Sequence, residues 1–164
     1  MIDDRFLKES AHVLRNHYLP KIREAVERLS DEQIWHRTGD ASNAVGNILL
    51  HMVGNIRQHI IAGVGGAPDE RNRPLEFAAR GGVPKAVLLA NLEKTIGEAA
   101  DVLEKFNPEL LLEERVIQGN RVALMNDIYH VVEHFAYHAG QIIFVSKAIA
   151  DRGFDWYKYL DPRP

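Results

Sequence analysis

The sequence predicts an all-α protein built as a four-helix bundle, and three observations indicate it. Apolar residues recur at helical spacing in four stretches, each roughly 20 to 28 residues long. Only one short stretch, 114–124, has the pattern of a β-hairpin. A single long Gly- and Pro-rich interval, 63–82, separates the second stretch from the third. These features favour antiparallel helices with a long crossover between helices 2 and 3 and a small hairpin before helix 4.

Length and composition narrow the class of protein. A chain of 164 residues is expected to form one domain, 1–164, with a core of its own. It has no cysteine, which excludes disulfides, zinc–thiolate sites and a protein thiol nucleophile, and is typical of a cytoplasmic protein. The net charge of −3 comes without a basic tract, so we expect no nucleic-acid partner. No apolar run reaches the length of a membrane span.

The first helix is expected over residues 3–29. Pro20 lies inside its pattern, so a kink or a brief break is predicted near 16–20. The stretch Ser30–Gln33 has the form of a capping box and predicts a short helical turn.

The second helix is predicted to begin after Ser42 and Asn43, which can cap it, and to end near Ala62. Its apolar stripe is interrupted by a line of polar residues at four-residue spacing. These residues are Asn47, His51, Asn55 and His59.

After the 63–82 interval, in which a turn of helix is expected around 75–80, the third helix should start near Pro84 and stop before Asn107. The hairpin that follows is predicted to turn at Gly119 and Asn120. The fourth helix is expected from about Met125 to Arg152. The aromatic residues of the tail, 153–160, are expected to pack on the bundle or on a second subunit.

The fourth helix carries His130, His134 and His138, each four residues from the next. Positions four apart lie on one helix face, one turn above another. Apolar residues such as Val131 and Phe135 flank this line. A polar line within an apolar face is costly unless its groups are satisfied, so something must satisfy these imidazoles.

A transition metal is one candidate. Two histidines at i, i+4 can place two nitrogens on one ion, and a third ligand must then come from another helix. His51, halfway along the second helix, is the best candidate to join His134 and His138. Three imidazoles with open positions suit Lewis-acid chemistry or activation of water. The His-Glu-x-x-His mechanism is excluded, because no Glu stands between His134 and His138.

The same histidines have simpler interpretations. A buried histidine pair is more often a hydrogen-bonded part of the core than a pair of metal ligands. His130 is a candidate ligand in place of His134, but a supporting position around the site or a place at the surface is favoured.

The remaining polar residues also allow two interpretations. Asn55 and Gln141 are candidates to support the ligands, or they bridge helices. His59 is expected to be partly exposed near its helix end. Asp127 is expected to be an N-cap.

Two motifs resemble those of a known family. His134-x-x-x-His138-x-Gly140-Gln141 is similar to the closing motif of the DinB-like superfamily, which includes the YfiT-like metal-dependent hydrolases. The stretch 42–51 resembles the helix-two motif of that family, which ends in a ligand histidine. The segment 65–77 is similar to a subgroup of unassigned function.

The resemblance implies that His51, His134 and His138 bind one divalent metal, usually zinc or nickel and sometimes iron or manganese. Relatives of known activity include S-transferases and isomerases that use a low-molecular-weight thiol such as bacillithiol or mycothiol. The absence of cysteine from this chain is consistent with an external thiol. Ala139 stands where many relatives have an Arg. The family also implies a homodimer.

Three functions are therefore carried forward. The first is a metal-dependent enzyme, of thiol S-transferase or hydrolase type, acting on a small-molecule substrate. If water is the nucleophile, His130, His59 and Glu133 are weak candidates for the base. The second is a non-catalytic stress-response or binding module with a structural or vestigial metal. The third is a plain helical dimer whose histidines are satisfied core groups.

Overall fold

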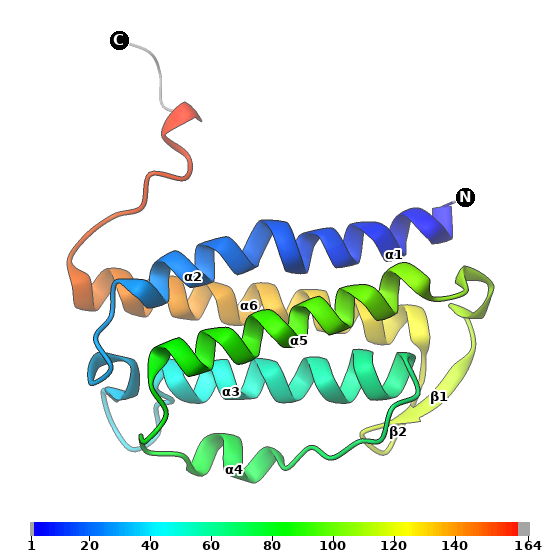
Figure 1. Ribbon diagram of the computed structural model, residues 1–164, viewed down its shortest axis with the longest axis horizontal. Helices are drawn as coiled ribbons and strands as arrows, with labels where there is room; N and C mark the ends of the chain where they lie inside the picture. Colours follow the sequence, from blue (N-terminus) through cyan, green and yellow to red (C-terminus); the bar gives the residue numbers. More distant parts are fainter. Residues whose placement is uncertain (1, 161–164) are drawn as a thin grey trace.

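The computed structural model describes residues 2–160, which are largely helical with one small antiparallel hairpin. Four long helical segments lie side by side in this part of the chain (Figure 1). Their bounds are α1 (Ile2–His12), a π-helical turn (Val13–Tyr18) and α2 (Leu19–Glu27); α3 (Val45–Ile56) with a second π-helical stretch (Arg57–Val64); α5 (Lys85–Lys105); and α6 (Leu124–Ala150). The coarser prediction, a mostly α-helical chain with a hairpin before the last helix, is confirmed.

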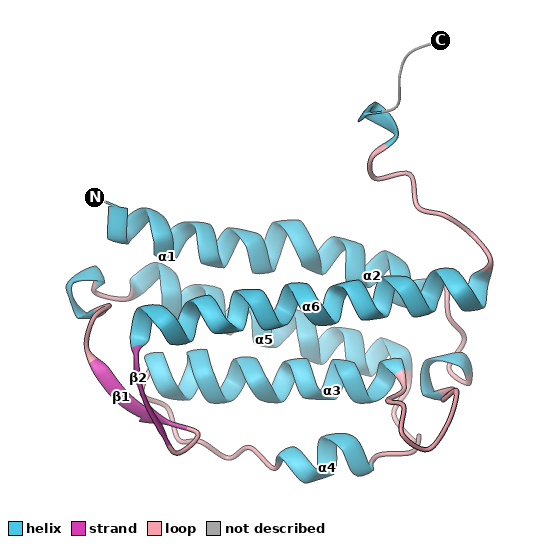
Figure 2. Ribbon diagram, turned by 180° about the vertical axis from the view of Figure 1, so that it is seen from behind, coloured by secondary structure: helices cyan, strands magenta, loops and turns pink. Residues whose placement is uncertain are grey.

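Packing between these segments buries their apolar stripes. The α3 helix packs against both α5 and α6, α1 packs on α5, and α2 packs on α6. Fully buried residues such as Leu14, Met52, Leu92 and Phe135 come from all four segments. The core is therefore continuous, and α3 and α6 face each other across it (Figure 2).

The predicted break around Pro20 takes the form of a wider helical turn. Pro20 has no N–H to donate to the preceding turn. The backbone N–H of Leu19 instead bonds the carbonyl of Leu14, five residues back, at the end of the π-helical turn Val13–Tyr18. The chain thus stays helical from Ile2 to Glu27, and the irregularity begins a few residues before the predicted 16–20.

The capping box at Ser30 forms as predicted. The Gln33 side chain accepts from the Ser30 N–H at 2.8 Å, and the Ser30 hydroxyl accepts from the Gln33 N–H at 3.1 Å. A short 3₁₀ turn, Gln33–Trp35, follows. The Trp35 indole N–H then donates to the carbonyl of Val83, tying this turn to the start of α5.

The cap predicted for the second helix is wrong. The helix begins at Val45 with Ala44 in the cap position, whereas the Ser42 hydroxyl bonds the backbone of Gly39. The Asn47 side chain takes over the capping role and accepts from the Ala44 N–H at 3.1 Å. An asparagine inside the first turn can satisfy a free N–H as well as one before it.

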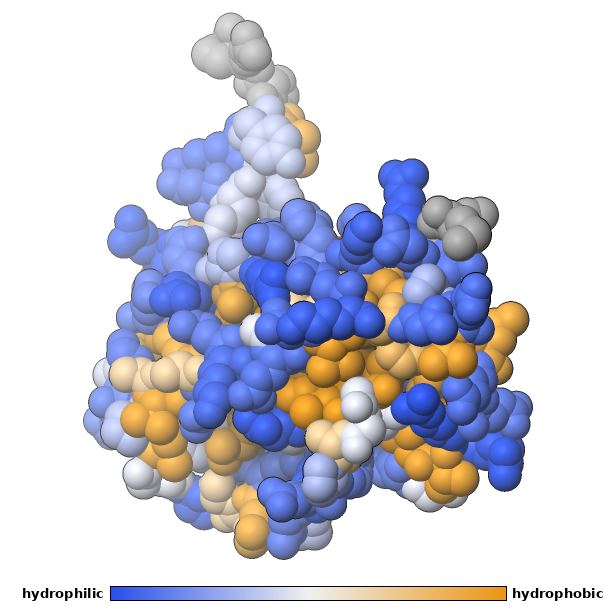
Figure 3. All heavy atoms as spheres, turned by 45° about the vertical axis from the view of Figure 1, so that its right-hand side comes forward, coloured by the Kyte–Doolittle hydropathy of each residue, from blue (hydrophilic) through white to orange (hydrophobic). Residues whose placement is uncertain are grey.

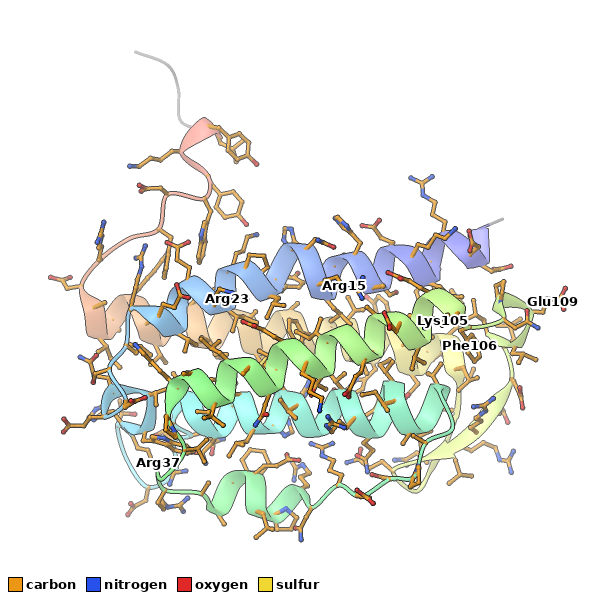
Figure 4. The ribbon with its side chains drawn as sticks, in the orientation of Figure 1. Arg15, Arg23, Arg37, Lys105, Phe106 and Glu109 are labelled. Atoms are coloured by element: carbon orange, nitrogen blue, oxygen red, sulfur yellow. The ribbon has the colours of Figure 1, made fainter. Side chains whose placement is uncertain are left out.

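Ion pairs join the first helical segment to α5 on the outside of the molecule. Arg15 and Arg23, labelled in Figure 4, lie on this segment. Arg15 bonds Glu104 at 3.0 Å, and Arg23 bonds Glu93 at 2.5 Å. These side chains are part-exposed, so each pair contributes at most about 1 kcal/mol.

The hairpin pairs β1 (Glu114–Ile117) with β2 (Asn120–Ala123). Its turn lies one residue earlier than predicted, because Asn120 pairs with Ile117 and the turn residues are Gln118 and Gly119. Both have positive φ, 52° and 78°, which is typical of a type I′ turn. Arg115 donates to the carbonyls of Gly63 and Val64 at 3.0 Å, so the hairpin is fastened to the end of the second helical segment.

The long connection between that segment and α5 contains the short helix α4 (Arg73–Ala78), which lies on the outer side of α3 (Figure 1). The Asn47 amide holds it in place by donating to the carbonyls of Glu76 and Ala79, each at 2.9 Å. The connection is thus attached to α3 at Asn47, about one helical turn before His51.

The aromatic tail folds back on α2. Phe154 stacks on Trp156, the Arg28 guanidinium lies 3.6 Å from the centre of the Phe154 ring, and the Trp156 indole donates to Glu24. Tyr159 stays exposed. Part of the tail therefore packs on its own chain.

None of the described helices is long and apolar enough to cross a membrane. In agreement, apolar side chains on the face shown in Figure 3 form patches interrupted by hydrophilic groups, without a continuous apolar belt.

Candidate metal centre

Three histidines predicted from the sequence meet between α3 and α6. His134 Nε2 lies 3.0 Å from His51 Nε2 and 3.1 Å from His138 Nε2, and one nitrogen from each ring lies within 4.8 Å of the others. Two ligands at about 2.05 Å from a tetrahedral ion stand about 3.3 Å apart. The two separations that involve His134 are close to that value.

The position of each histidine follows from its helix. His134 and His138 are one turn apart on α6, so their rings project on the same side, with centres 4.3 Å apart. His51 projects from α3, which packs on this part of α6, and is buried. His134 and His138 are half-buried, which leaves one side of the cluster open.

Burial and crowding favour the uncharged form of His134 and His138. Burial, followed by the neighbouring imidazoles of His138 and His51, lowers the pKa of His134 from its usual 6.5 to about 3. Burial also lowers the pKa of His138, against the opposing effect of its bond to Gln141. Neutral imidazole is the form that ligates metals.

Hydrogen bonds at the far side of two rings set their tautomers. His51 Nδ1 lies 2.8 Å from Glu76 Oε2, and His138 Nδ1 lies 2.7 Å from Gln141 Oε1. Arg71 Nη2 also lies 3.0 Å from His51 Nδ1, but it has an acceptor in Glu76 Oε2 at the same distance. The ionised Glu76 and the Gln141 oxygen can only accept, so the proton of each ring is assigned to Nδ1 and both Nε2 lone pairs point at His134. His134 Nε2 has one hydrogen at most, so it can satisfy only one of them. At least one of the two lone pairs is therefore left without a donor, and a shared cation would satisfy it.

A buried ion pair stands behind His51. Arg71 Nε donates to Glu76 Oε1 at 2.8 Å and its Nη2 donates to Oε2 at 3.0 Å, with the Arg71 side chain only 2% exposed. Burial alone raises the pKa of Glu76, but the bonds from His51 and Arg71 outweigh it and hold that pKa below its usual range. Gln58 accepts from Arg71 Nη1 at 2.9 Å and completes the network.

Sequence reasoning missed Glu76 and Arg71. They lie in and beside α4, in a charged stretch without helical periodicity, so spacing did not single them out. One available signal was Gly54, which follows His51 on the same helix. A Cβ at Gly54 would lie 1.9 Å from Glu76 Oε1, so only glycine lets the carboxylate approach this closely.

The other residues predicted to support the site differ in whether they contact the three histidines. Gln141 contacts a clustered histidine, as described. Asn55 is buried one turn beyond His51 and makes no hydrogen bond to the three rings. His130 is exposed, and its ring centre lies 5.7 Å from that of His134. Glu133 is exposed on α6.

Two simpler interpretations made from the sequence are wrong. His59 is buried, 5% exposed, instead of partly exposed, and its Nδ1 lies 2.8 Å from Asp127 Oδ1. Asp127 is not an N-cap, because α6 begins at Leu124 with Ala123 in the cap position. The reason is that Asp127 falls on the inner face of α6, where a buried carboxylate needs a donor and His59 supplies it.

Comparison with curated proteins found no match to this chain. A model of the family described as "Protein of unknown function (DUF1572)" matches residues 2–160, nearly the full length of the chain. The chain therefore belongs to the DUF1572 family, whose function is not assigned.

Proposed function

We propose that His51, His134 and His138 hold one divalent metal ion, zinc or nickel in the first place, and that the protein is a metal-dependent enzyme. The observation that carries this proposal is the convergence of three Nε2 atoms at 3.0 and 3.1 Å, with two of their lone pairs fixed toward the third ring. Without a cation at least one of these lone pairs has no donor, and three histidines are a ligand set that such ions accept.

The ligand set fits a catalytic site better than a structural one. Structural zinc sites are closed by four protein ligands, whereas catalytic sites have three and keep a position open. Here the described residues supply three, and the half-buried rings of His134 and His138 leave a route from solvent. A divalent ion in such a site acts as a Lewis acid and lowers the pKa of a thiol or water that it binds.

The residues around the cluster have roles in this proposal. Glu76 holds the His51 tautomer that presents Nε2 to the cluster, Arg71 holds Glu76, and Gln141 does the same for His138. Such partners fix ring orientation and raise the basicity of the ligand.

The reaction class follows from family likeness. The four helical segments, the long crossover and the histidine motifs support placing the chain in the DinB-like superfamily as a four-helix bundle. On that basis we propose a thiol S-transferase or hydrolase type of reaction on a small-molecule substrate. No cysteine exists in the chain, so a thiol nucleophile would be external.

Metal content tests the first step. Protein purified without an affinity tag is expected to contain about one equivalent of zinc or nickel, and chelation is expected to lower its melting temperature. Metal at 100 times its dissociation constant stabilises the folded state by about 2.7 kcal/mol. His134→Ala should abolish that gain, while His12→Ala, at an exposed histidine, should keep it. Metal-free protein with no response to added zinc or nickel would refute the proposal.

Turnover separates an enzyme from a binding module. We expect a low-molecular-weight thiol to react with an electrophilic aryl halide faster in the presence of the protein, and the gain to vanish with chelator or in His134→Ala. Loss of stability in His134→Ala with no catalysis by the wild-type protein over a panel of thiols and electrophiles would instead support the non-catalytic module.

A homodimer is proposed as the assembled state. Tyr129, Tyr137 and Phe144 are exposed by 62%, 63% and 72% on α6. Their spacings of eight and seven residues keep them within about 80° of one another around that helix. Exposed aromatic residues of this kind are common in interfaces. Light scattering on the wild type and on Tyr137→Glu tests it, with a lower mass expected for the variant.

A further inference from the structure

The second histidine–carboxylate pair, His59 with Asp127, borders a pocket of about 310 Å³. The pocket lies between the hairpin, the second π-helical stretch and the start of α6. Its wall is made by the pair together with His130, Asn120 and Asn126 and with apolar groups of the hairpin.

The pair presents hydrogen-bonding atoms that no described residue engages. His59 Nε2 and Asp127 Oδ2 are buried and have no partner among residues 2–160, although both residues are only 5% exposed. When the His59 ring is neutral and Asp127 Oδ1 accepts from its Nδ1, His59 Nε2 is an acceptor. The two residues that carry these acceptors, one of them a carboxylate, line the same pocket.

The charge of the pocket wall narrows the class of ligand further. Asp127 is the one formally charged residue among those that form the pocket wall. A buried carboxylate without a positive partner is costly. A hydroxyl offers a single donor, whereas an ammonium offers three donors and a compensating charge.

We propose that this pocket binds a primary ammonium group, held by Asp127 Oδ2 and His59 Nε2. The neutral amides of Asn120 and Asn126 leave room for polar groups next to the amine, and Ile117 and Val122 cover a short carbon chain. The class of ligand is therefore a small primary amine or amino alcohol, or a larger molecule that carries such a group.

The pocket adjoins the candidate metal centre. The His130 ring borders the pocket, and its centre lies 5.4 Å from that of His59 and 5.7 Å from that of His134. If the proposed function holds, the pocket would position the amino end of a substrate whose reactive group lies at the three histidines. This last step rests on the proposed function, whereas binding of the amine does not.

Titration of ¹⁵N-labelled full-length protein by NMR tests the binding, with the protein as purified and after chelation. The probes are ethanolammonium chloride, ethylene glycol and tetramethylammonium chloride. We expect saturable shifts around His59 and Asp127 with ethanolammonium, in both metal states, and at least tenfold weaker binding of the other two. Equal binding of ethylene glycol, or no saturable shift with ethanolammonium, would overturn the proposal.

Matched variants locate the site. Asp127→Asn keeps the shape but removes the charge, and should weaken ethanolammonium at least tenfold. Glu9→Gln removes an exposed carboxylate from α1, away from the pocket, and should leave ethanolammonium binding unchanged. If Asp127→Asn does not fold, the ¹⁵N shifts of the His59 ring still decide: a neutral ring protonated at Nδ1 supports the proposal, and a doubly protonated ring refutes it. Because these tests include the chelated protein, failure of metal binding leaves their outcome unaffected.

Discussion

Replacing Glu76 with glutamine should weaken metal binding without touching a ligand. In the wild-type protein Glu76 Oε2 accepts from His51 Nδ1 at 2.8 Å, and this fixes the proton on Nδ1. The carboxylate also takes two bonds from Arg71, at 2.8 and 3.0 Å. An amide has one oxygen only, and Arg71 cannot accept from the NH₂ group of glutamine, so that oxygen should turn to Arg71. The NH₂ group then faces His51 Nδ1, which favours the tautomer protonated at Nε2, the atom that must bind the metal.

The size of the effect follows from these contacts. Loss of a supporting partner of a ligand histidine costs about 10- to 100-fold in metal affinity, equivalent to about 1.4 to 2.7 kcal/mol. The variant should also lose stability without metal, because the Arg71 side chain is 2% exposed and loses the full charge of its partner. Removing one member of a buried pair costs about 3 to 5 kcal/mol, and glutamine, which keeps one bond, should cost less.

Competition with a chromophoric chelator gives the zinc and nickel dissociation constants, and urea denaturation with chelator present gives the stability of the metal-free protein. The matched control is Glu70→Gln, which removes an exposed carboxylate from the same connection. We expect the control to match wild type in both assays. If Glu76→Gln is folded and binds both metals within twofold of wild type, the carboxylate does not orient His51 and the reasoning is refuted.

Three further predictions follow from the described contacts. Gly54→Ala should displace the Glu76 carboxylate, because the new Cβ would lie 1.9 Å from Glu76 Oε1, and should lower zinc affinity about tenfold in the chelator assay. Gly97→Ala, which has open space around its Cβ, should leave zinc affinity unchanged. The metal-free protein should lose stability as pH falls from 6.5 toward 3. In that range the unfolded chain takes up a proton at His134, whereas the folded protein, in which the pKa of His134 is about 3, does not. Urea denaturation at several pH values measures this loss, which should be smaller in His134→Gln. Phe135→Ala, at a residue 1% exposed, should cost about 3 to 5 kcal/mol by the same method, while Phe144→Ala, at 72% exposure, should change monomer stability by less than about 0.5 kcal/mol.

The helical part of the candidate site could be predicted because α-helices repeat. Residues four apart must share a face, so the spacing of His134 and His138 indicated neighbouring rings before any tertiary contact was known. The apolar stripes of two helices likewise indicated that His51 faces the interior. The same reasoning placed the helix starts within a few residues, and its errors at Ser42 and at the hairpin turn came from local side-chain hydrogen bonds and backbone twist, which periodicity does not encode.

The supporting residues could not be found in this way. Glu76 and Arg71 lie on the connection between α3 and α5, which Asn47 holds by its hydrogen bonds to Glu76 and Ala79. No repeat in the sequence relates Glu76 or Arg71 to His51. The buried pair of His59 and Asp127 was missed for a different reason. A carboxylate in the first turn of a helix usually satisfies free N–H groups, and here it faces inward instead.

The geometry of α3 explains how two histidine sites can share one helix. In a regular α-helix residues eight apart are rotated by about 80°, so His51 and His59 would point in different directions. The π-helical stretch Arg57–Val64 begins just before His59 and turns less per residue, which reduces that rotation and keeps His59 facing α6. Each histidine then meets a carboxylate from another element, Glu76 from the connection and Asp127 from α6. The irregular helix is thus what aligns both pairs along one side of α6, and a substitution that restored regular α-helix there should turn His59 away from Asp127 while leaving the three clustered histidines in place.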